Sequence, residues 1–275
     1  MVLFMTQHPS NSLRSSVLCC FLIFATAPAC GWSEPAPAAV AAFNSYISTV
    51  EARLDQQHRA HNGFIAPVTS DAQSEARLRQ GELIIEQITP STTADLPGAM
   101  LYHWRGTAFA PGAKAADFER LMKNFDAYPQ IYSPQVLQSK ILSQQGEIFK
   151  VMMRVRQKHV ITVVMDTAYD VTFARLDSLH GYSISRSTQI TEIDSPGTRH
   201  ERALTSSEEH GFLWRLNTYW SYEERDGGLY MQIESVSLTR SVPTGLGWAI
   251  GPFVESVPRE SLEFTLRTTC NALRK

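Results

Sequence analysis

The sequence lacks the features that mark most nucleic-acid-binding proteins and most motif-defined enzymes. It carries 25 Lys and Arg against 27 Asp and Glu, for a net charge of −2, and like charges do not cluster in long runs. Neither nucleic acid nor an acidic membrane surface is therefore indicated as a partner. It also has no Cys-x-x-Cys, no His-Glu-x-x-His and no Gly-x-Ser-x-Gly. These absences leave no motif for a redox, zinc-protease or serine-hydrolase site.

Metal ligands are similarly sparse. His58 and His61 have the i, i+3 spacing of one helix face, but no third ligand lies nearby in the sequence. A structural or catalytic zinc site needs at least three protein ligands. We therefore predict neither a metal nor a cofactor.

No apolar stretch is long enough for a transmembrane helix in the mature chain. Residues 16–29 are apolar and follow Arg14, and they end in Ala27-Pro28-Ala29. A bilayer-spanning helix needs about 20 residues, whereas this layout is typical of a cleaved secretory signal. We predict a signal peptide over residues 1–29 and a periplasmic or secreted protein. An uncleaved anchor and a lipid anchor on Cys30 are the alternatives.

Cysteine is scarce once that signal is removed. The mature chain holds Cys30 and Cys270 only. Cys270 lies on an apolar helix stripe, where buried free cysteine is common, although an exported protein meets an oxidising compartment. The sequence leaves open whether the two thiols pair.

The apolar fraction of 43% is enough to fill a core, and periodicity divides the chain into segments. Residues 30–80 are predicted to form a linker and an N-terminal helical extension, because Val40, Phe43, Ile47, Val50 and Leu54 share one helix face. The main domain is predicted over residues 82–275. What the extension packs on, and the oligomeric state, are left open.

The sequence of the main domain predicts a series of strands followed by one long C-terminal helix. Alternating or β-branched runs at 83–89, 100–109, 136–143, 148–156, 160–173, 182–193, 212–224 and 229–240 predict an antiparallel sheet, and 114–125 predicts a helix. In the last segment, Leu262, Leu266, Cys270 and Leu273 form one apolar stripe. A sheet with one terminal helix must bury its apolar face under that helix. We predict an α+β fold with a curved sheet wrapped around the C-terminal helix.

Residues 124–134, Asn-Phe-Asp-Ala-Tyr-Pro-Gln-Ile-Tyr-Ser-Pro, follow a predicted helix. This corner resembles that of START-like helix-grip domains (the SRPBCC superfamily), above all the coenzyme Q-binding and polyketide cyclase-like group. The resemblance covers roughly residues 82–273. It implies a helix-grip fold that binds apolar ligands such as lipids, quinones, sterols or polyketides under the terminal helix. The resemblance assigns no catalytic residue, because no catalytic residue is common to all members of the superfamily.

The densest aromatic segment, residues 212–220, is the expected wall of that cavity. The expected lining is Trp214, Leu216, Trp220 and Tyr222, with Met231 and Ile233 on the next strand and Phe253, Val257, Leu262 and Leu266 on the helix. Ordinary core packing of the same residues is the alternative. Arg154, Glu234 and Arg240 are candidate polar anchors if they point inward, and surface ion pairing is the alternative for them.

Three functions fit the sequence. The first is binding of a hydrophobic small molecule or lipid between sheet and helix. The second is a polyketide cyclase or dehydratase that uses the same cavity, which requires inward polar groups with shifted pKa values. The third is a scaffold whose interior is filled by side chains.

Overall fold

The computed structural model describes residues 34–60, 63–66, 73–89, 96–158, 162–241 and 247–274, without the side chains of 247–255. The chain divides into two units, residues 1–31 and 32–275, and all described residues belong to the second. The predicted signal peptide and Cys30 lie outside the described residues. Cys270 is buried and free.

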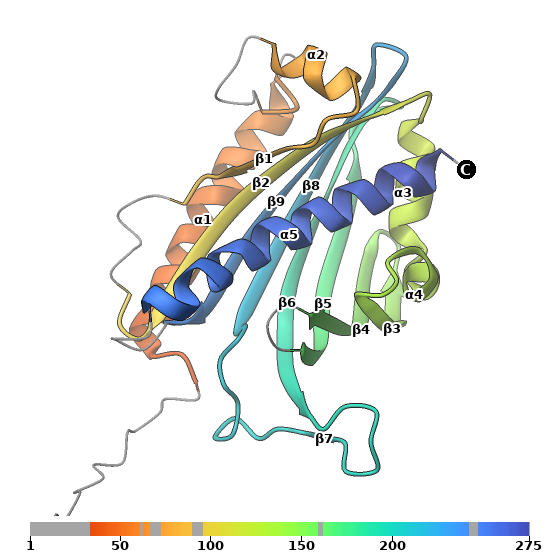
Figure 1. Cartoon of the computed structure of the whole chain (residues 1–275). Coiled ribbons are helices and arrows are strands. Elements are labelled where there is room, and N and C mark those ends of the chain that lie inside the picture. Colours follow the sequence, from red (N-terminus) through yellow and green to blue (C-terminus); the bar gives the residue numbers. More distant parts are fainter. Residues whose placement is uncertain are drawn as a thin grey trace, which may run out of the picture. The chain divides into compact units, whose positions relative to one another are not determined.

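In the described residues nine strands form one antiparallel sheet, and all of them except the short β7 correspond to the predicted segments (Figure 1). They are β1 (Ile84–Gln87), β2 (Ala99–Pro111), β3 (Val136–Gln145), β4 (Ile148–Lys158), β5 (Thr162–Arg175), β6 (His180–Asp194), β7 (Arg202–Ala203), β8 (Arg215–Arg225) and β9 (Gly228–Arg240). The order is β1-β2-β9-β8-β6-β5-β4-β3, with β7 paired to β6. Each hairpin pairs two strands that are neighbours in the sequence. The pairing of β2 with β9, by contrast, joins strands more than 100 residues apart.

The hairpin between β8 and β9 shows how a local signal fixes register. Asp226 and Gly227 connect β8 to β9 with φ of 54° and 74°. A two-residue hairpin with a type I′ turn needs positive φ at both central positions, where Asp-Gly is favoured. Arg225 consequently faces Gly228, and the register runs on to Arg215 opposite Leu238.

The terminal helix α5 (Gly247–Leu273) crosses one face of the sheet, here called the inner face (Figure 1). Leu262, Leu266 and Cys270 are buried against that face, so the predicted stripe is confirmed. Gly106 on β2 allows the close approach, because a Cβ there would lie 2.6 Å from Leu266 Cδ1. The architecture is the α+β helix-grip fold that the sequence predicts.

The helix α1 (Pro37–Arg59) covers the opposite, outer face of the sheet (Figure 1). It begins three residues before Val40, the first residue of the predicted stripe, and Pro37 occupies its first turn, where a missing N–H has no cost. Its buried stripe is Ala39, Phe43, Ile47, Val50 and Leu54, which packs on Leu101, Trp214, Tyr219, Val236 and Leu238. The extension therefore folds back on its own sheet. The short α2 (Ser74–Arg79) precedes β1.

Between β2 and β3 lie α3 (Ala115–Lys123), the 3-10 turn η2 (Phe125–Ala127) and α4 (Tyr128–Ile131). They form the predicted proline-containing corner. Phe118, Phe125 and Tyr132 are buried there, and the Tyr128 hydroxyl donates to the Met122 carbonyl oxygen at 2.7 Å. The corner therefore closes one end of the inner face.

Candidate functional site

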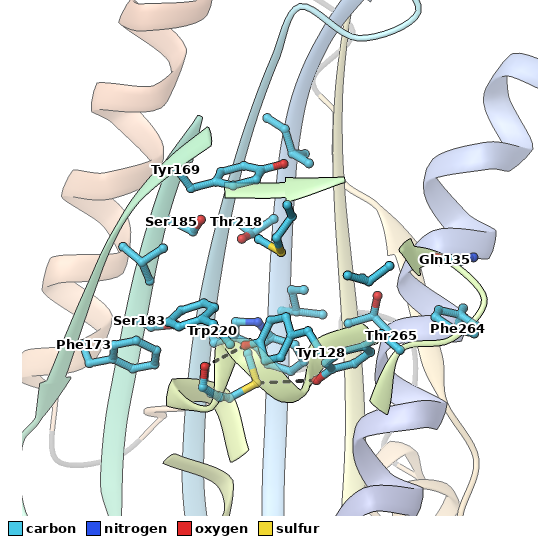
Figure 2. A pocket seen from close by; sticks show the side chains of 18 residues that line it. Tyr128, Gln135, Tyr169, Phe173, Ser183, Ser185, Thr218, Trp220, Phe264 and Thr265 are labelled. Atoms are coloured by element: carbon cyan, nitrogen blue, oxygen red, sulfur yellow. Dashed lines mark hydrogen bonds between the residues drawn. The ribbon is translucent and has the colours of Figure 1, made fainter. Parts of the chain in front are cut away.

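The inner face holds a cavity of about 200 Å³ (Figure 2). The corner, the curved sheet and α5 all contribute to its wall. The lining residues are Met122, Phe125, Tyr128, Tyr132, Gln135, Val136, Met153, Tyr169, Val171, Phe173, Ser183, Ser185, Leu216, Thr218, Trp220, Ile233, Phe264 and Thr265. Most of them present aromatic or aliphatic carbon, as small-molecule sites commonly do.

The only titratable side chains in this lining are three tyrosines. Burial raises the pKa of Tyr132 and of Tyr169 to about 12, and it raises the pKa of Tyr128 well above its usual value. All three hydroxyls are therefore neutral at pH 7. The Tyr132 hydroxyl also lies 3.0 Å from Thr269 Oγ1, so it is partly used within the protein. None of the eighteen lining residues is Asp, Glu, Lys, Arg or His.

One wall of the cavity is polar but uncharged. Ser183 and Ser185 alternate along β6, directly opposite Trp220 and Thr218 on β8. All four line the cavity, and Figure 2 shows Ser185 and Thr218 side by side. Their neighbours on the cavity surface are apolar rings such as Phe173. The cavity therefore combines an apolar body with one uncharged polar patch.

The predicted cavity residues differ in whether they line the cavity or only pack around it. Leu216, Trp220 and Ile233 line the cavity itself. Tyr222, Met231, Leu262 and Leu266 belong to the buried cluster around it without lining it. Val257 is half-buried on α5 and is outside the lining. The side chain of Phe253 lies outside the described residues.

Trp214 requires a correction, because it packs in the cluster under α1 on the outer face. Strand alternation placed it with Leu216 and Trp220. However, β8 begins at Arg215, so the period of two does not extend to Trp214. A residue just outside a strand is free of that alternation.

The predicted polar anchors also lie away from the cavity lining. Arg154 forms two hydrogen bonds to Asp166 on β5, at 2.7 and 2.9 Å, and a third to Glu201 at 2.5 Å. Arg240 ends β9 and does not line the cavity. The alternative of ion pairing is therefore the one that the structure supports for Arg154.

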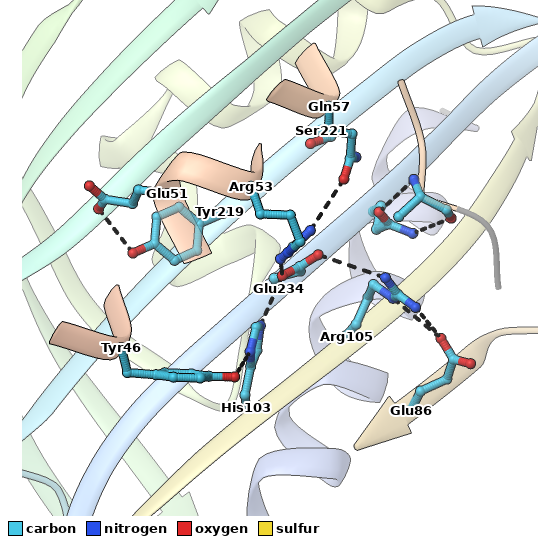
Figure 3. Close-up of polar contacts among 12 residues, drawn as sticks. Tyr46, Glu51, Arg53, Gln57, Glu86, His103, Arg105, Tyr219, Ser221 and Glu234 are labelled. Atoms are coloured by element: carbon cyan, nitrogen blue, oxygen red, sulfur yellow. Dashed lines mark hydrogen bonds and ion pairs between the residues drawn. The ribbon is translucent and has the colours of Figure 1, made fainter. Parts of the chain in front are cut away.

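Glu234 is the third anchor, and it is buried on the outer face under α1 (Figure 3). His103 Nε2 lies 2.8 Å from its Oε2, and Tyr46 of α1 contacts the other ring nitrogen of His103 at 2.8 Å. Arg53 of α1 forms an ion pair with the same carboxylate, and Arg105 Nη1 lies 4.0 Å from Oε1. Alternation explains the placement, since Ile233 faces the cavity and its neighbour must face away.

The surroundings of Glu234 keep it ionised. Burial by itself raises the pKa of this carboxyl, but the His103 hydrogen bond and the charge of Arg53 outweigh it. The net result is a pKa below the ordinary value. Buried carboxylates are rarely found without such partners. We refer to Tyr46, His103, Glu234, Arg53 and Arg105 as the outer-face network.

Many cavity residues were missed by sequence reasoning, although some signal was present. Tyr169, Val171 and Phe173 alternate on β5 in the same way as the aromatic segment on β8. The corner residues Tyr128 and Tyr132 carried the resemblance but were not assigned to the lining. On α5, Phe264 and Thr265 line the cavity beside the predicted stripe of Leu262 and Leu266. An apolar stripe predicts which face of a helix is buried. It does not predict which residues beside the stripe border a cavity.

No helix in the described part of the chain is long and apolar enough to cross a membrane. Within the same residues, no three His, Cys, Asp or Glu side chains gather in a way that could hold a metal ion.

Solved structures with a similar fold are numerous. They include a START superfamily protein from Mycobacterium smegmatis (14% identity, TM-score 0.42, 62% of this chain and 97% of that one). A STAR-related lipid transfer protein from Xanthomonas axonopodis aligns at 16% identity and TM-score 0.43, over 70% and 99%. The Zhui aromatase/cyclase from a Streptomyces species aligns at 13% and 0.42, over 63% and 94%.

A scan of the sequence against protein-family models gives no match, and a search of curated proteins also gives none. At these identities and TM-scores the structural likenesses carry no argument about ligand or activity. The strand order and the position of α5 are those of a helix-grip α+β fold.

Proposed function

We propose that this protein binds a hydrophobic small molecule or a lipid segment in the cavity between the sheet and α5. The observation that carries the proposal is a cavity of about 200 Å³ whose described lining is largely apolar and carries no charge. Water gains little there, because most of the wall offers it no hydrogen bond. An apolar ligand replaces that water at low cost.

The expected energetics are sufficient for binding. Apolar burial contributes about 25 cal/mol per Å², so a ligand that buries about 300 Å² gains roughly 7 kcal/mol. The loss of translational and rotational freedom offsets a large part of that gain. The cavity volume suits a ring system or a short acyl segment better than a whole phospholipid.

The alternative of a cyclase or dehydratase has less support in the geometry. Acid–base catalysis works best with groups whose pKa lies near the operating pH. The titratable groups in the lining are tyrosines with raised pKa values, and Arg154 and Glu234 lie elsewhere. His210 binds Glu192, with its Nδ1 2.8 Å from the carboxylate, and is outside the lining. Ligand binding without chemistry is therefore the proposal.

The test fills the cavity without changing its polarity. Val171→Phe places a ring into the lining, whereas Thr172→Phe places the same ring on the opposite face of the same strand. Ethylbenzene is the probe, and ligand-observed NMR measures its binding. We expect binding to the wild type and to Thr172→Phe, and at least a tenfold loss in Val171→Phe. Equal binding to all three proteins would overturn the proposal. Native mass spectrometry of mildly purified protein then shows whether a co-purified ligand is lost in the same variant.

Export is a second part of the proposal. It is supported by Arg14, the apolar residues 16–29 and the small residues Ala27 and Ala29. Expression of the whole chain, followed by cell fractionation and N-terminal sequencing, tests it. A mature N-terminus near Cys30 is expected, and a full-length cytoplasmic protein would contradict it.

A further inference from the structure

The polar patch on the cavity wall is made of two directly opposed residue pairs. Ser183 faces Trp220, and Ser185 faces Thr218, across neighbouring strands β6 and β8. Opposed residues of an antiparallel pair have Cβ atoms about 4.5–5.5 Å apart. The four side chains therefore form one compact group, which we call the polar quartet.

The polar atoms of the quartet are not used within the protein. Across the described residues, the three hydroxyls and the Trp220 indole N–H have no hydrogen-bond partner. Ser183 and Trp220 are each 4% exposed, and Ser185 and Thr218 are half-buried. By contrast, the hydroxyl of Ser187, two residues beyond Ser185 on β6, accepts a hydrogen bond from the Leu216 N–H. No polar atom of the quartet is among the fully buried side-chain atoms that lack a partner in the described residues, so these atoms are open to the cavity and available to a molecule bound there.

The chemistry of the quartet restricts what could satisfy it. The indole N–H can only donate, and a hydroxyl can donate or accept. A ligand oxygen that accepts hydrogen bonds fits both kinds of group. An anionic oxygen does not fit, because the described lining has no Lys, Arg or His to offset the cost of burying its charge.

We infer that the cavity selects an uncharged ligand with a carbonyl or hydroxyl oxygen on an otherwise apolar body, and that the polar quartet binds this oxygen. This inference rests on the proposed function and deepens it. Ser185 and Thr218 are its specificity-determining residues. The rings of Phe173 and Phe125, with the aliphatic residues Val171 and Ile233, hold the apolar body. A pure hydrocarbon would leave the quartet unsatisfied, and a free carboxylate would be excluded.

Three probes of matched shape test this selection. Ethylbenzene has no oxygen, acetophenone has a neutral carbonyl at the same position, and benzoate is an anion at pH 7. Binding is measured by ligand-observed NMR on the purified full-length mature protein. One net hydrogen bond is worth about 0.5–1.5 kcal/mol, so acetophenone should bind about twofold to tenfold more tightly than ethylbenzene. Benzoate should bind at least tenfold more weakly than acetophenone.

The double variant Ser185→Ala/Thr218→Val removes two hydroxyls with little change in volume. It should abolish the preference for acetophenone and leave ethylbenzene binding unchanged or slightly stronger. Thr172→Val, on the opposite face of β5, is the matched control and should keep the preference. Circular dichroism and the single variants Ser185→Ala and Thr218→Val verify that a loss does not reflect misfolding.

The outcomes separate the two proposals. If ethylbenzene binds in a manner that Val171→Phe abolishes, but acetophenone has no advantage, the proposed function stands and the inference is overturned. The inference is also overturned if benzoate binds most tightly, or if the double variant keeps the acetophenone preference. If none of the three probes binds to the wild type, the proposed function itself falls, and the inference falls with it.

Discussion

The two faces of the sheet differ in the volume left unfilled and in the charge that they bury. Under α5 the inner face encloses about 200 Å³, lined by residues without charge. Under α1 the outer face leaves a cavity of only about 60 Å³ and buries the carboxylate of Glu234 among His103, Arg53 and Arg105. The same strands serve both faces, because Ile233 and Glu234 are neighbours on β9 that point in opposite directions.

The difference is one of lining as well as size, because Glu51, Asp55 and His58 border the small outer-face cavity, whereas the larger inner-face cavity has an uncharged described lining. A buried carboxylate needs donors at hydrogen-bond distance, which draws α1 tightly onto the sheet. The inner face has no such requirement, since apolar packing is non-directional and tolerates a void at modest cost. The outer face is therefore a closed structural layer, and the inner face is the one available to a ligand.

The largest expected effect comes from Glu234→Ala. The substitution leaves the buried His103 ring without the carboxylate that contacts its Nε2, while Arg105 keeps its hydrogen bonds to Glu86. A buried polar group left unsatisfied costs about 1–3 kcal/mol. Urea unfolding followed by circular dichroism measures the loss of free energy of unfolding. Ethylbenzene affinity should remain within twofold for the protein that stays folded.

Its matched control is the next residue on the strand. Ile233→Val removes one methyl group from the cavity side and should cost only about 0.5–1.5 kcal/mol. If the two substitutions destabilise the protein equally, the outer-face network has no special role, and the contrast between the faces is broken.

A smaller effect is expected from pH. Burial lowers the pKa of His58, which hydrogen-bonds to Ser221 under α1, to about 4. Between pH 6.5 and 4 the unfolded chain binds a proton at this histidine and the folded protein does not. Stability from His58 is thus present above pH 6.5 and lost as the pH falls, by about 1–2 kcal/mol after allowance for its partial exposure.

His58→Gln should flatten this part of the pH profile, because glutamine does not titrate but can still bind Ser221. The measurement compares urea midpoints of the two proteins at pH 4.5 and 7.5. Probe affinity, which depends on the uncharged inner face, should be the same at pH 5.5 and 7.5. A histidine variant that remains as acid-sensitive as the wild type would assign the sensitivity to other groups.

The smallest effect is expected on the inner face itself. Tyr132→Phe removes a hydroxyl that lies 3.0 Å from Thr269 Oγ1 and contacts Met122 Sδ, and it should cost about 1 kcal/mol. Thr269 still donates to the Thr265 carbonyl oxygen, so little is left unsatisfied. A double-mutant cycle with Thr269→Val measures the coupling between the two hydroxyls, which should be below that of the Glu234–His103 pair. A larger coupling here would reverse the proposed order of the two faces.

The sequence predicted the fold well because its signals are local. The Asp226-Gly227 turn, the alternation of Leu101, His103 and Arg105 against Tyr102 and Trp104, and the Leu262–Leu266 stripe each depend on residues close in the chain. The site was predicted less well. Leu216 and Trp220 lie at the cavity as alternation predicts, whereas Trp214, which precedes the first residue of β8, packs under α1. Glu234 was proposed as an anchor without considering that it alternates with Ile233 and so faces the other side of the sheet.

By itself the sequence determined which residues form strands and helices and which face of each is apolar, because backbone periodicity and turn chemistry act over a few residues. Only the tertiary structure decided that β2 pairs with β9, that α1 and α5 take opposite faces, and that a void remains beside Ser185 and Thr218. Those outcomes depend on the packing of side chains from segments more than 100 residues apart. A cavity is the volume that such packing leaves unfilled, and no local pattern encodes it.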